Sequence, residues 1–517
     1  MREDRLRTLA RCIVTAWLCV VVTACTADPQ TRFETAGASG SEAARCQAVI
    51  ARVTAEVEAS ATHDAEASQI PSFPFLRVNR FLASFAASDL DPAASRAWLE
   101  RLHALALDGI QIELGNLAPT VRKHLDDHAN SVMQRSAIEA VTYCADVSVH
   151  NLLSSPEAQI KLRDSIVVPD HYDDLQRVVG VYPLTALPVA IGYDYWRRAN
   201  LGTFAQQPRA LPTDGQRTAY RSSGDTGALP PAEVRAILER SRKNSLGIPE
   251  PSPGDAARLI DAYAPVWIVD TVGPDDRIGS ISWDRDEALA VSIDRPVVYH
   301  QLSWTRFGDD ILLQLNYLAW FPARPTQGSL DLLGGPLDGV IWRVTLGPDG
   351  RPMIFDSIHA CGCYHLFFPV PPLTAKPGPP ARDIQERAEV PARGPKLAPG
   401  DRVAIWLAGV SHYIQTLSTT TKAEPEATQV HSYDMVPADG LRRLDWPSGG
   451  SRSMYGPDGI VDGTERLERF LLWPMGIASP GAMRQWGTHA TAFVGRRHFD
   501  DPWLFEDAFQ MPADNRR

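Results

Sequence analysis

The stretch 356–369, Asp-Ser-Ile-His-Ala-Cys-Gly-Cys-Tyr-His-Leu-Phe-Phe-Pro, is the densest group of metal-binding and redox-capable side chains in this chain. His359, Cys361, Cys363 and His365 occupy every second position, so in an extended strand they would share one face. At about 3.3 Å per residue the two histidines would lie roughly 20 Å apart, too far for one ion whose ligands sit about 2–2.3 Å away. We therefore expect the chain to turn at Gly362, where glycine tolerates a positive φ.

Metal binding is the first chemistry that this stretch allows. Thiolate and imidazole ligands suit zinc or copper rather than magnesium, so zinc is the possible cofactor. The expected ligands are His359, Cys361, Cys363 and His365, with a distant histidine such as His412 completing the shell. The spacing matches none of the usual structural zinc patterns, which leaves other chemistries open.

A disulfide between Cys361 and Cys363 is the second possibility, and it also needs a bend at Gly362. The third makes one of these thiols, with Cys363 as the candidate, a nucleophile with His365 as base and Asp356 as the orienting acid. Metal or thiol chemistry would indicate a hydrolase. A structural disulfide would instead indicate a non-catalytic binding or assembly protein, and the sequence leaves both functions open.

Strands are expected to position this stretch. The β-branched and aromatic residues of 340–346 and 353–358 predict two strands, and the Gly-Pro-Asp-Gly sequence at 347–350 predicts the turn of a hairpin between them. Another strand or two are expected over 401–417, which includes His412. The aromatic stretch 317–324 fits a buried strand better than the wall of a carbohydrate or peptide groove.

The N-terminal part of the chain has helical periodicity instead. Asp91 and Pro92 predict an N-cap and a first-turn proline, and 131–153 carries apolar residues at helical spacing. The sequence therefore predicts an α+β protein, in which a helical domain (46–200) precedes a mixed, mainly antiparallel sheet with flanking helices (231–517). Residues 201–230 lose apolar periodicity and gain Pro, Gly, Ser and Thr, so a linker is expected there.

The first 24 residues are typical of a signal peptide, because four arginines precede a short apolar run, 12–22. Val22-Thr-Ala-Cys25 resembles the lipobox of bacterial lipoproteins. This resemblance implies cleavage before Cys25, which would carry the lipid anchor with acyl chains such as palmitate. Thr26 follows Cys25 at the position where lipoproteins retained in the inner membrane usually have aspartate. The resemblance therefore implies that the protein is anchored in the outer membrane and faces the periplasm. Residues 25–45 have the small, polar composition of a flexible tether.

Loss of the signal peptide would take the net charge from −11 to −13, which makes nucleic acid a poor partner. The membrane, contacted through the lipid on Cys25, is the expected partner, and a small molecule, peptide or glycan is left unspecified. Four cysteines follow Cys25, an even number suited to an oxidising compartment. Pairing Cys46 with Cys144 is the simplest prediction, since it leaves the close pair 361/363 together.

Overall fold

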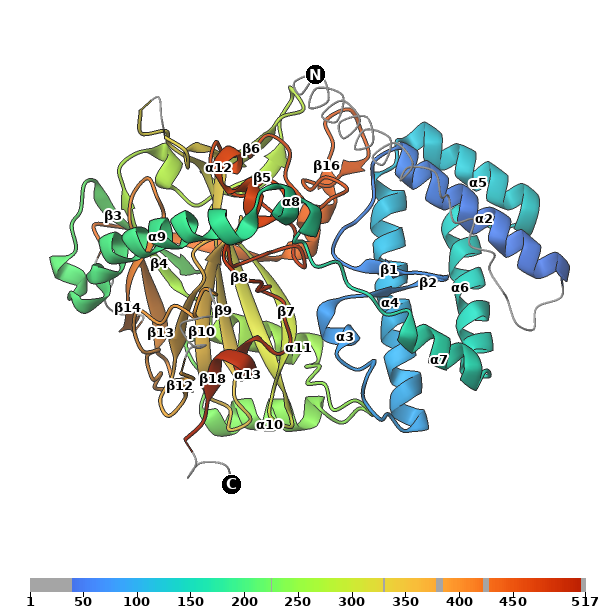
Figure 1. The fold of residues 1–517 in the computed structure, drawn as a ribbon, viewed down its shortest axis with the longest axis horizontal. Helices are drawn as coiled ribbons and strands as arrows, with labels where there is room; N and C mark the ends of the chain where they lie inside the picture. The colour runs from blue at the N-terminus through green and yellow to red at the C-terminus, as the bar shows by residue number, and fades with distance from the viewer. Residues whose placement is uncertain (1–39, 225, 329–330, 378–384, 422–426, 513–517) are drawn as a thin grey trace, which may run out of the picture.

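The computed structural model describes residues 40–224, 226–328, 331–377, 385–421 and 427–512 (Figure 1). The expected signal peptide and the lipid attachment site lie outside these residues. The described chain contains many helices and one large mixed sheet, so the prediction of an α+β fold is confirmed in its broad form.

The N-terminal helices run along one side of the molecule (Figure 1). They are α2 (Gly40–Ala59), α3 (Arg80–Ala83), α4 (Pro92–Asn116), α5 (Pro119–Met133), α6 (Ala137–Leu153) and α7 (Pro156–Asp164). The predicted N-cap is confirmed, because the Asp91 carboxylate accepts a hydrogen bond from the Ala94 N–H at 2.8 Å. A small hairpin of β1 (Ser68–Ile70) and β2 (Phe73–Val78) was not expected among these helices, and β2 packs against α4.

Within the described residues, ten strands form one sheet in the order β11-β10-β9-β8-β7-β15-β3-β4-β13-β14. Most neighbours are antiparallel, and the parallel pairs are β7/β15, β15/β3 and β4/β13. The strands are β3 (Gln216–Ser222), β4 (Val266–Thr271), β7 (Val297–Phe307), β8 (Asp310–Arg324), β9 (Gly335–Leu346), β10 (Pro352–His359), β11 (Leu366–Pro369), β13 (Arg402–Leu407), β14 (Ile414–Thr420) and β15 (Gln429–Pro437). The predicted β9–β10 hairpin is confirmed.

The linker expected over 201–230 is wrong in its central part. Two short 3₁₀ helices, η1 (Leu201–Ala205) and η2 (Pro208–Ala210), lead into β3, which lies in the interior of the sheet between β15 and β4. Ala219 and Tyr220 are buried there. The strand is only seven residues long, so the surrounding Pro, Gly and Ser concealed it from a composition argument.

Two helices cover one face of the sheet. They are α10 (Pro231–Ser241) and α11 (Pro253–Ala262), and Trp267, Tyr317 and Trp342 are buried in the same core. The other elements are short: β5 (Ser280–Trp283), β6 (Leu289–Ser292), β12 (Thr374–Ala375), β16 (Leu444–Asp445), β17 (Ser451–Arg452), β18 (Phe509–Gln510), η3 (Pro274–Asp276), η4 (Ala438–Arg442), η5 (Trp473–Met475), α12 (Arg469–Leu472) and α13 (Leu504–Ala508).

Two helices expected to belong with the N-terminal set lie against the sheet instead. Figure 1 shows α9 (Tyr182–Asn200) crossing above one end of the strands, with α8 (Asp174–Val179) beside it. Both pack against η5, and α9 also contacts η1. The end of the sheet covered by α9 is where the candidate site is found.

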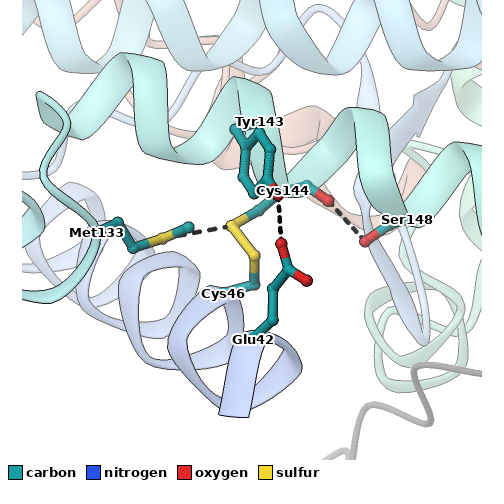
Figure 2. Close-up of a disulfide and its surroundings, with 6 residues drawn as sticks. All are labelled: Glu42, Cys46, Met133, Tyr143, Cys144 and Ser148. Atoms are coloured by element: carbon teal, nitrogen blue, oxygen red, sulfur yellow. Dashed lines mark hydrogen bonds between the residues drawn. A yellow bond between two sulfur atoms is a disulfide. The ribbon is translucent and has the colours of Figure 1, made fainter. Parts of the chain in front are cut away.

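The predicted Cys46–Cys144 disulfide is confirmed and joins α2 to α6 (Figure 2). It links residues 98 positions apart. In the chain-entropy model, closing a loop of this length stabilises the fold by about 4–5 kcal/mol. None of the helices in the described parts of the chain has the length and apolar character needed to cross a membrane.

Candidate functional site

The stretch that follows β10 forms a tight turn, as its glycine predicted. The His359 N–H donates to the Cys363 carbonyl at 2.9 Å, and the Gly362 N–H donates to the His359 carbonyl at 2.8 Å. Gly362 has φ +90°, and a Cβ there would meet the Ala490 carbonyl oxygen at 2.6 Å. Only glycine fits both the conformation and the space.

The turn sends the four expected metal ligands to different partners. His359 Nδ1 lies 3.4 Å from Asp338 on β9, whereas His365 Nε2 lies 2.9 Å from Asp356 on β10. Across the described residues, no group of three or more His, Cys, Asp or Glu side chains is arranged to hold a metal ion. The structure therefore does not bring residues 359, 361, 363, 365 and 412 into one ligand set: Asp338 contacts both His359 and His412, whereas Asp356 contacts His365.

Cys361 and Cys363 are both buried and both free, so the expected disulfide between them is not formed. The Cys363 N–H points to the Cys361 sulfur at 3.4 Å. The hydrogen bond between the two thiols, together with burial, raises the pKa of Cys363 well above its ordinary value. A protonated thiol is a poor nucleophile, since thiolate is the reactive form.

His365 and Asp356, the other two residues of the expected catalytic group, do contact each other in the core. Arg343 also binds Asp356 through two hydrogen bonds of 2.9 and 2.6 Å, and Thr491 lies 3.1 Å from His365 Nδ1. Burial lowers the pKa of His365 to about 3, despite the opposing effect of Asp356. Both ring nitrogens and both carboxylate oxygens are engaged, so the geometry is that of a structural core network.

His412 lies in the turn between β13 and β14, between two carboxylates. Its Nδ1 is 2.7 Å from Asp338 and its Nε2 is 3.3 Å from Asp276, while Phe321 stacks on the ring at 4.0 Å. Burial alone would lower the pKa of His412, but the two carboxylates outweigh it, so its pKa is raised. An imidazolium bridging two acids ties η3, β9 and this turn together.

A cavity of about 1160 Å³ opens beside the turn, under α9. The turn 361–365, which carries both free thiols and is called the thiol turn below, forms part of its wall. Helix α9 contributes Pro188, Val189, Gly192, Tyr193 and Trp196. Most of the lining is apolar, with a few charged groups from distant parts of the chain. Large, mainly apolar cavities with few convergent polar groups are typical ligand sites.

Aromatic side chains carry the polar groups of one wall. Trp196 packs against Tyr364 and Tyr413, with ring centroids 4.8 and 5.5 Å apart. Arg324, at the end of β8, donates to the Tyr413 hydroxyl at 3.2 Å, and Tyr413 donates to the Tyr364 hydroxyl at 2.7 Å. Tyr364 thus accepts from Tyr413, which leaves its own hydrogen available to an acceptor in the cavity.

Two glutamates, Glu468 and Glu386, are among the other polar groups of the lining. Burial raises the pKa of Glu468 to about 7, because Arg324 and Arg466 counteract it only in part. Glu386 accepts hydrogen bonds from the Phe493 and Val494 N–H groups at 2.8 and 2.9 Å, and burial raises its pKa as well. Because of this raised pKa, the Glu468 carboxyl can take up a proton near neutral pH.

Sequence reasoning missed most of this wall. Tyr317, Trp320 and Phe321 are buried core residues, as expected for the aromatic stretch, whereas Arg324 at its end lines the cavity. Trp196 and Glu468 carry no local signal, since each lies far along the chain from the turn.

No family model matches this chain, and no similar protein was found among the curated proteins or the solved structures.

Proposed function

We propose that this protein is a lipid-anchored binding protein of the bacterial envelope that holds an amphipathic small molecule with an apolar body and an acidic head. The single observation that carries the proposal is the cavity of about 1160 Å³. Its volume is at the upper end of small-molecule sites, and its apolar lining favours a long or fused hydrocarbon body.

Arg324 favours an acidic head. Its only side-chain hydrogen bond among the described residues goes to the Tyr413 hydroxyl, and no carboxylate of those residues lies within 4.0 Å of its guanidinium. Glu468 and Asp338 act on this guanidinium only at longer range, so it gains from an anionic ligand in direct contact, because hydrogen bonds to charged groups are stronger than neutral ones. The Tyr364 hydroxyl would supply a second donor to the same head.

Placement in the envelope rests on the N-terminal sequence. Cleavage before Cys25 and acylation of that residue would leave the mature protein on the outer membrane, facing the periplasm. Mass spectrometry of the mature N-terminal peptide tests this, because a diacylglyceryl-modified Cys25 is expected and an unmodified peptide that begins elsewhere contradicts it. Hydrolysis by the thiol turn stays an untested prediction.

Calorimetric titration with palmitate, compared with hexadecanol, tests the binding function. Palmitate should bind more tightly than the alcohol, and Arg324→Gln should abolish that preference. Arg295→Gln is the matched control, because Arg295 is exposed and lies outside the cavity lining. Absence of binding by both ligands to the folded protein would contradict the proposal.

A further inference from the structure

Apolar side chains are unusually exposed on the elements that cover the cavity. On α9, the exposed residues Leu184, Leu187, Ile191 and Tyr195 follow helical spacing and so share one face. Leu184 is 73% exposed and Tyr195 is 77% exposed. Monomeric soluble proteins rarely expose a contiguous row of large apolar side chains to water.

The neighbouring elements extend this row into a patch. Leu175 and Val178 of α8 are exposed, and so are Phe470 and Leu471 of α12. Helices α8, α9 and α12 all pack against η5, so they form one continuous region, and in Figure 1 α12 lies above α8 and α9. We refer to these exposed faces together as the α8–α9–α12 surface.

The cavity-lining residues of α9 lie on the face next to this row, roughly 100° around the helix. Pro188, Val189, Gly192 and Trp196 line the cavity, whereas the row from Leu184 to Tyr195 faces outward. The same helix therefore contributes side chains both to the cavity and to the exposed surface beside it. Leu471 belongs to both, since it lines the cavity and is 61% exposed.

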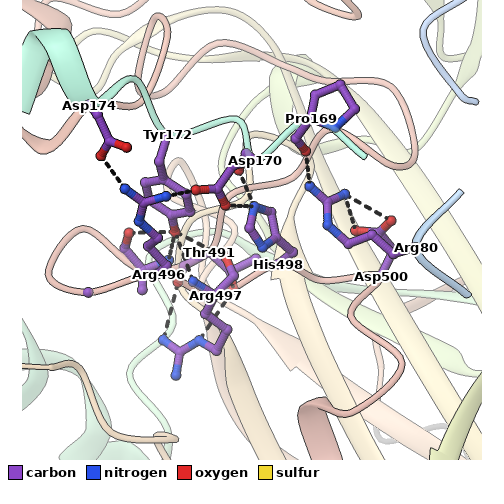
Figure 3. A network of polar contacts seen from close by, with 12 residues as sticks. Arg80, Pro169, Asp170, Tyr172, Asp174, Thr491, Arg496, Arg497, His498 and Asp500 are labelled. Carbon is purple, nitrogen blue, oxygen red and sulfur yellow. Dashed lines mark hydrogen bonds and ion pairs between the residues drawn. The ribbon is translucent and has the colours of Figure 1, made fainter. Parts of the chain in front are cut away.

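Polar contacts hold α8 and the residues before it against the C-terminal segment 473–497. Figure 3 shows Arg496 between Asp170 and Asp174 at the start of α8, and the Tyr172 hydroxyl donates to the Ala492 carbonyl at 2.8 Å. Arg177, within α8, donates to the Met475 carbonyl at 2.8 Å. The exposed apolar side chains thus project from an ordered platform.

The rim of the surface has the composition of a membrane interface. Tyr195 and the half-exposed Trp473 are aromatic, and Arg198 and Arg469 are exposed at the ends of α9 and α12. Trp, Tyr and Arg prefer the boundary between lipid and water, because each combines an apolar body with a polar end.

We propose that the α8–α9–α12 surface docks on the lipid bilayer and opens the cavity toward it. This docking proposal rests on the proposed function, because it uses the expected lipid anchor at Cys25. The anchor holds the protein next to a bilayer, which is why a bilayer and not another protein is proposed to cover the surface. Cys25 lies 15 residues before Gly40, where α2 begins. Even a fully extended chain of that length reaches only roughly 50 Å, so the bilayer stays within about one domain diameter.

Site-directed fluorescence on the full chain tests the docking. Ile191→Cys and, as a matched control, Val430→Cys on β15 each carry an environment-sensitive NBD probe; these residues are 63% and 50% exposed. The native thiols Cys361 and Cys363 are buried. With vesicles of phosphatidylethanolamine and phosphatidylglycerol, the probe at 191 should shift to shorter wavelength and be quenched by doxyl-labelled lipid, while the probe at 430 stays in water.

Equal exposure of both probes in the presence of vesicles would overturn the proposal. A probe at 191 that is already shielded without vesicles, in protein that elutes as a dimer, would show that a second copy covers the surface and would also overturn it. A Leu187→Glu/Ile191→Glu variant should lose the vesicle-dependent signal of a probe at Val178 and keep the native unfolding temperature. Palmitate binding in vesicle-free solution tests the cavity separately, so the two proposals fail independently.

Discussion

The Tyr413 hydroxyl donates to the Tyr364 hydroxyl at 2.7 Å and itself accepts a hydrogen bond from Arg324. Arg324 and Tyr364 line the cavity, and Tyr413 connects them from behind the wall. The direction of these hydrogen bonds matters. Because the Tyr364 hydroxyl accepts from Tyr413, its own hydrogen is free to be donated to the polar head of a bound ligand.

Tyr364→Phe should weaken palmitate binding by roughly tenfold or more, because a hydrogen bond to a charged group contributes about 1.5–3 kcal/mol. Calorimetry measures the affinity directly. Tyr433→Phe is the control: Tyr433 donates to the Pro265 carbonyl in the core and does not line the cavity. An unchanged affinity in Tyr364→Phe would remove this hydroxyl from the binding site.

Binding of palmitate should strengthen as the pH falls from one unit above neutrality to one unit below. Glu468 has a pKa of about 7, so it takes up a proton in this window and loses its negative charge beside the bound carboxylate. If ligand binding raises the pKa of Glu468 by about one unit, the affinity changes about tenfold across this pH range. In Glu468→Gln the pH dependence should flatten, whereas Glu465→Gln should keep it.

Gly192→Leu should block the cavity without unfolding the protein. A Cβ at Gly192 would meet no atom within 4 Å, and the residue lines the cavity from α9. The added side chain occupies ligand volume, so affinity should fall at least tenfold, while thermal stability is kept because glycine disfavours a helix interior. Gly202→Leu, equally unobstructed but outside the lining, is the control. Full binding by Gly192→Leu would place the ligand elsewhere.

Asp356→Asn should lower the free energy of unfolding by about 3–5 kcal/mol, because it leaves Arg343 buried without a counter-charge. Urea unfolding measures the loss. Asp434→Asn breaks an exposed pair with Arg295 and should cost less than about 1 kcal/mol. Burial would raise the pKa of Asp356, yet Arg343 and His365 lower it. This carboxylate therefore stabilises the fold above about pH 4 and less so as the pH falls further.

Thiol titration of the mature protein, denatured without reductant, should find two thiols per chain, from Cys361 and Cys363. The native protein should react slowly, because both side chains are buried. No thiols after denaturation would show that the two residues are joined, contrary to the structure.

The local features of this chain were open to prediction from its sequence. The turn at Gly362, the β9–β10 hairpin and the cap at Asp91 depend on residues a few positions apart. The Cys46–Cys144 pair followed from counting cysteines. Each of these rests on short-range geometry or on simple elimination.

The candidate site was not predictable in the same way. Arg324, Tyr413 and Glu468 come from separate parts of the chain and meet only because the sheet order brings their strands and turns together. The expected metal ligands are dispersed for the same reason, since Asp338 on β9 contacts His359 and His412 while Asp356 on β10 contacts His365. Sequence spacing shows which side chains are available, but the strand pairing decides their partners.

The disulfide has a mechanical consequence. Cys46 lies in the first half of α2, and its partner lies within α6, so a pull on the N-terminus enters the folded body at a covalent crosslink (Figure 2). Force could unwind only the residues of α2 before Cys46. Beyond that point the load passes to α6 and the helices around it, so the hairpin and sheet are shielded from being peeled away one element at a time.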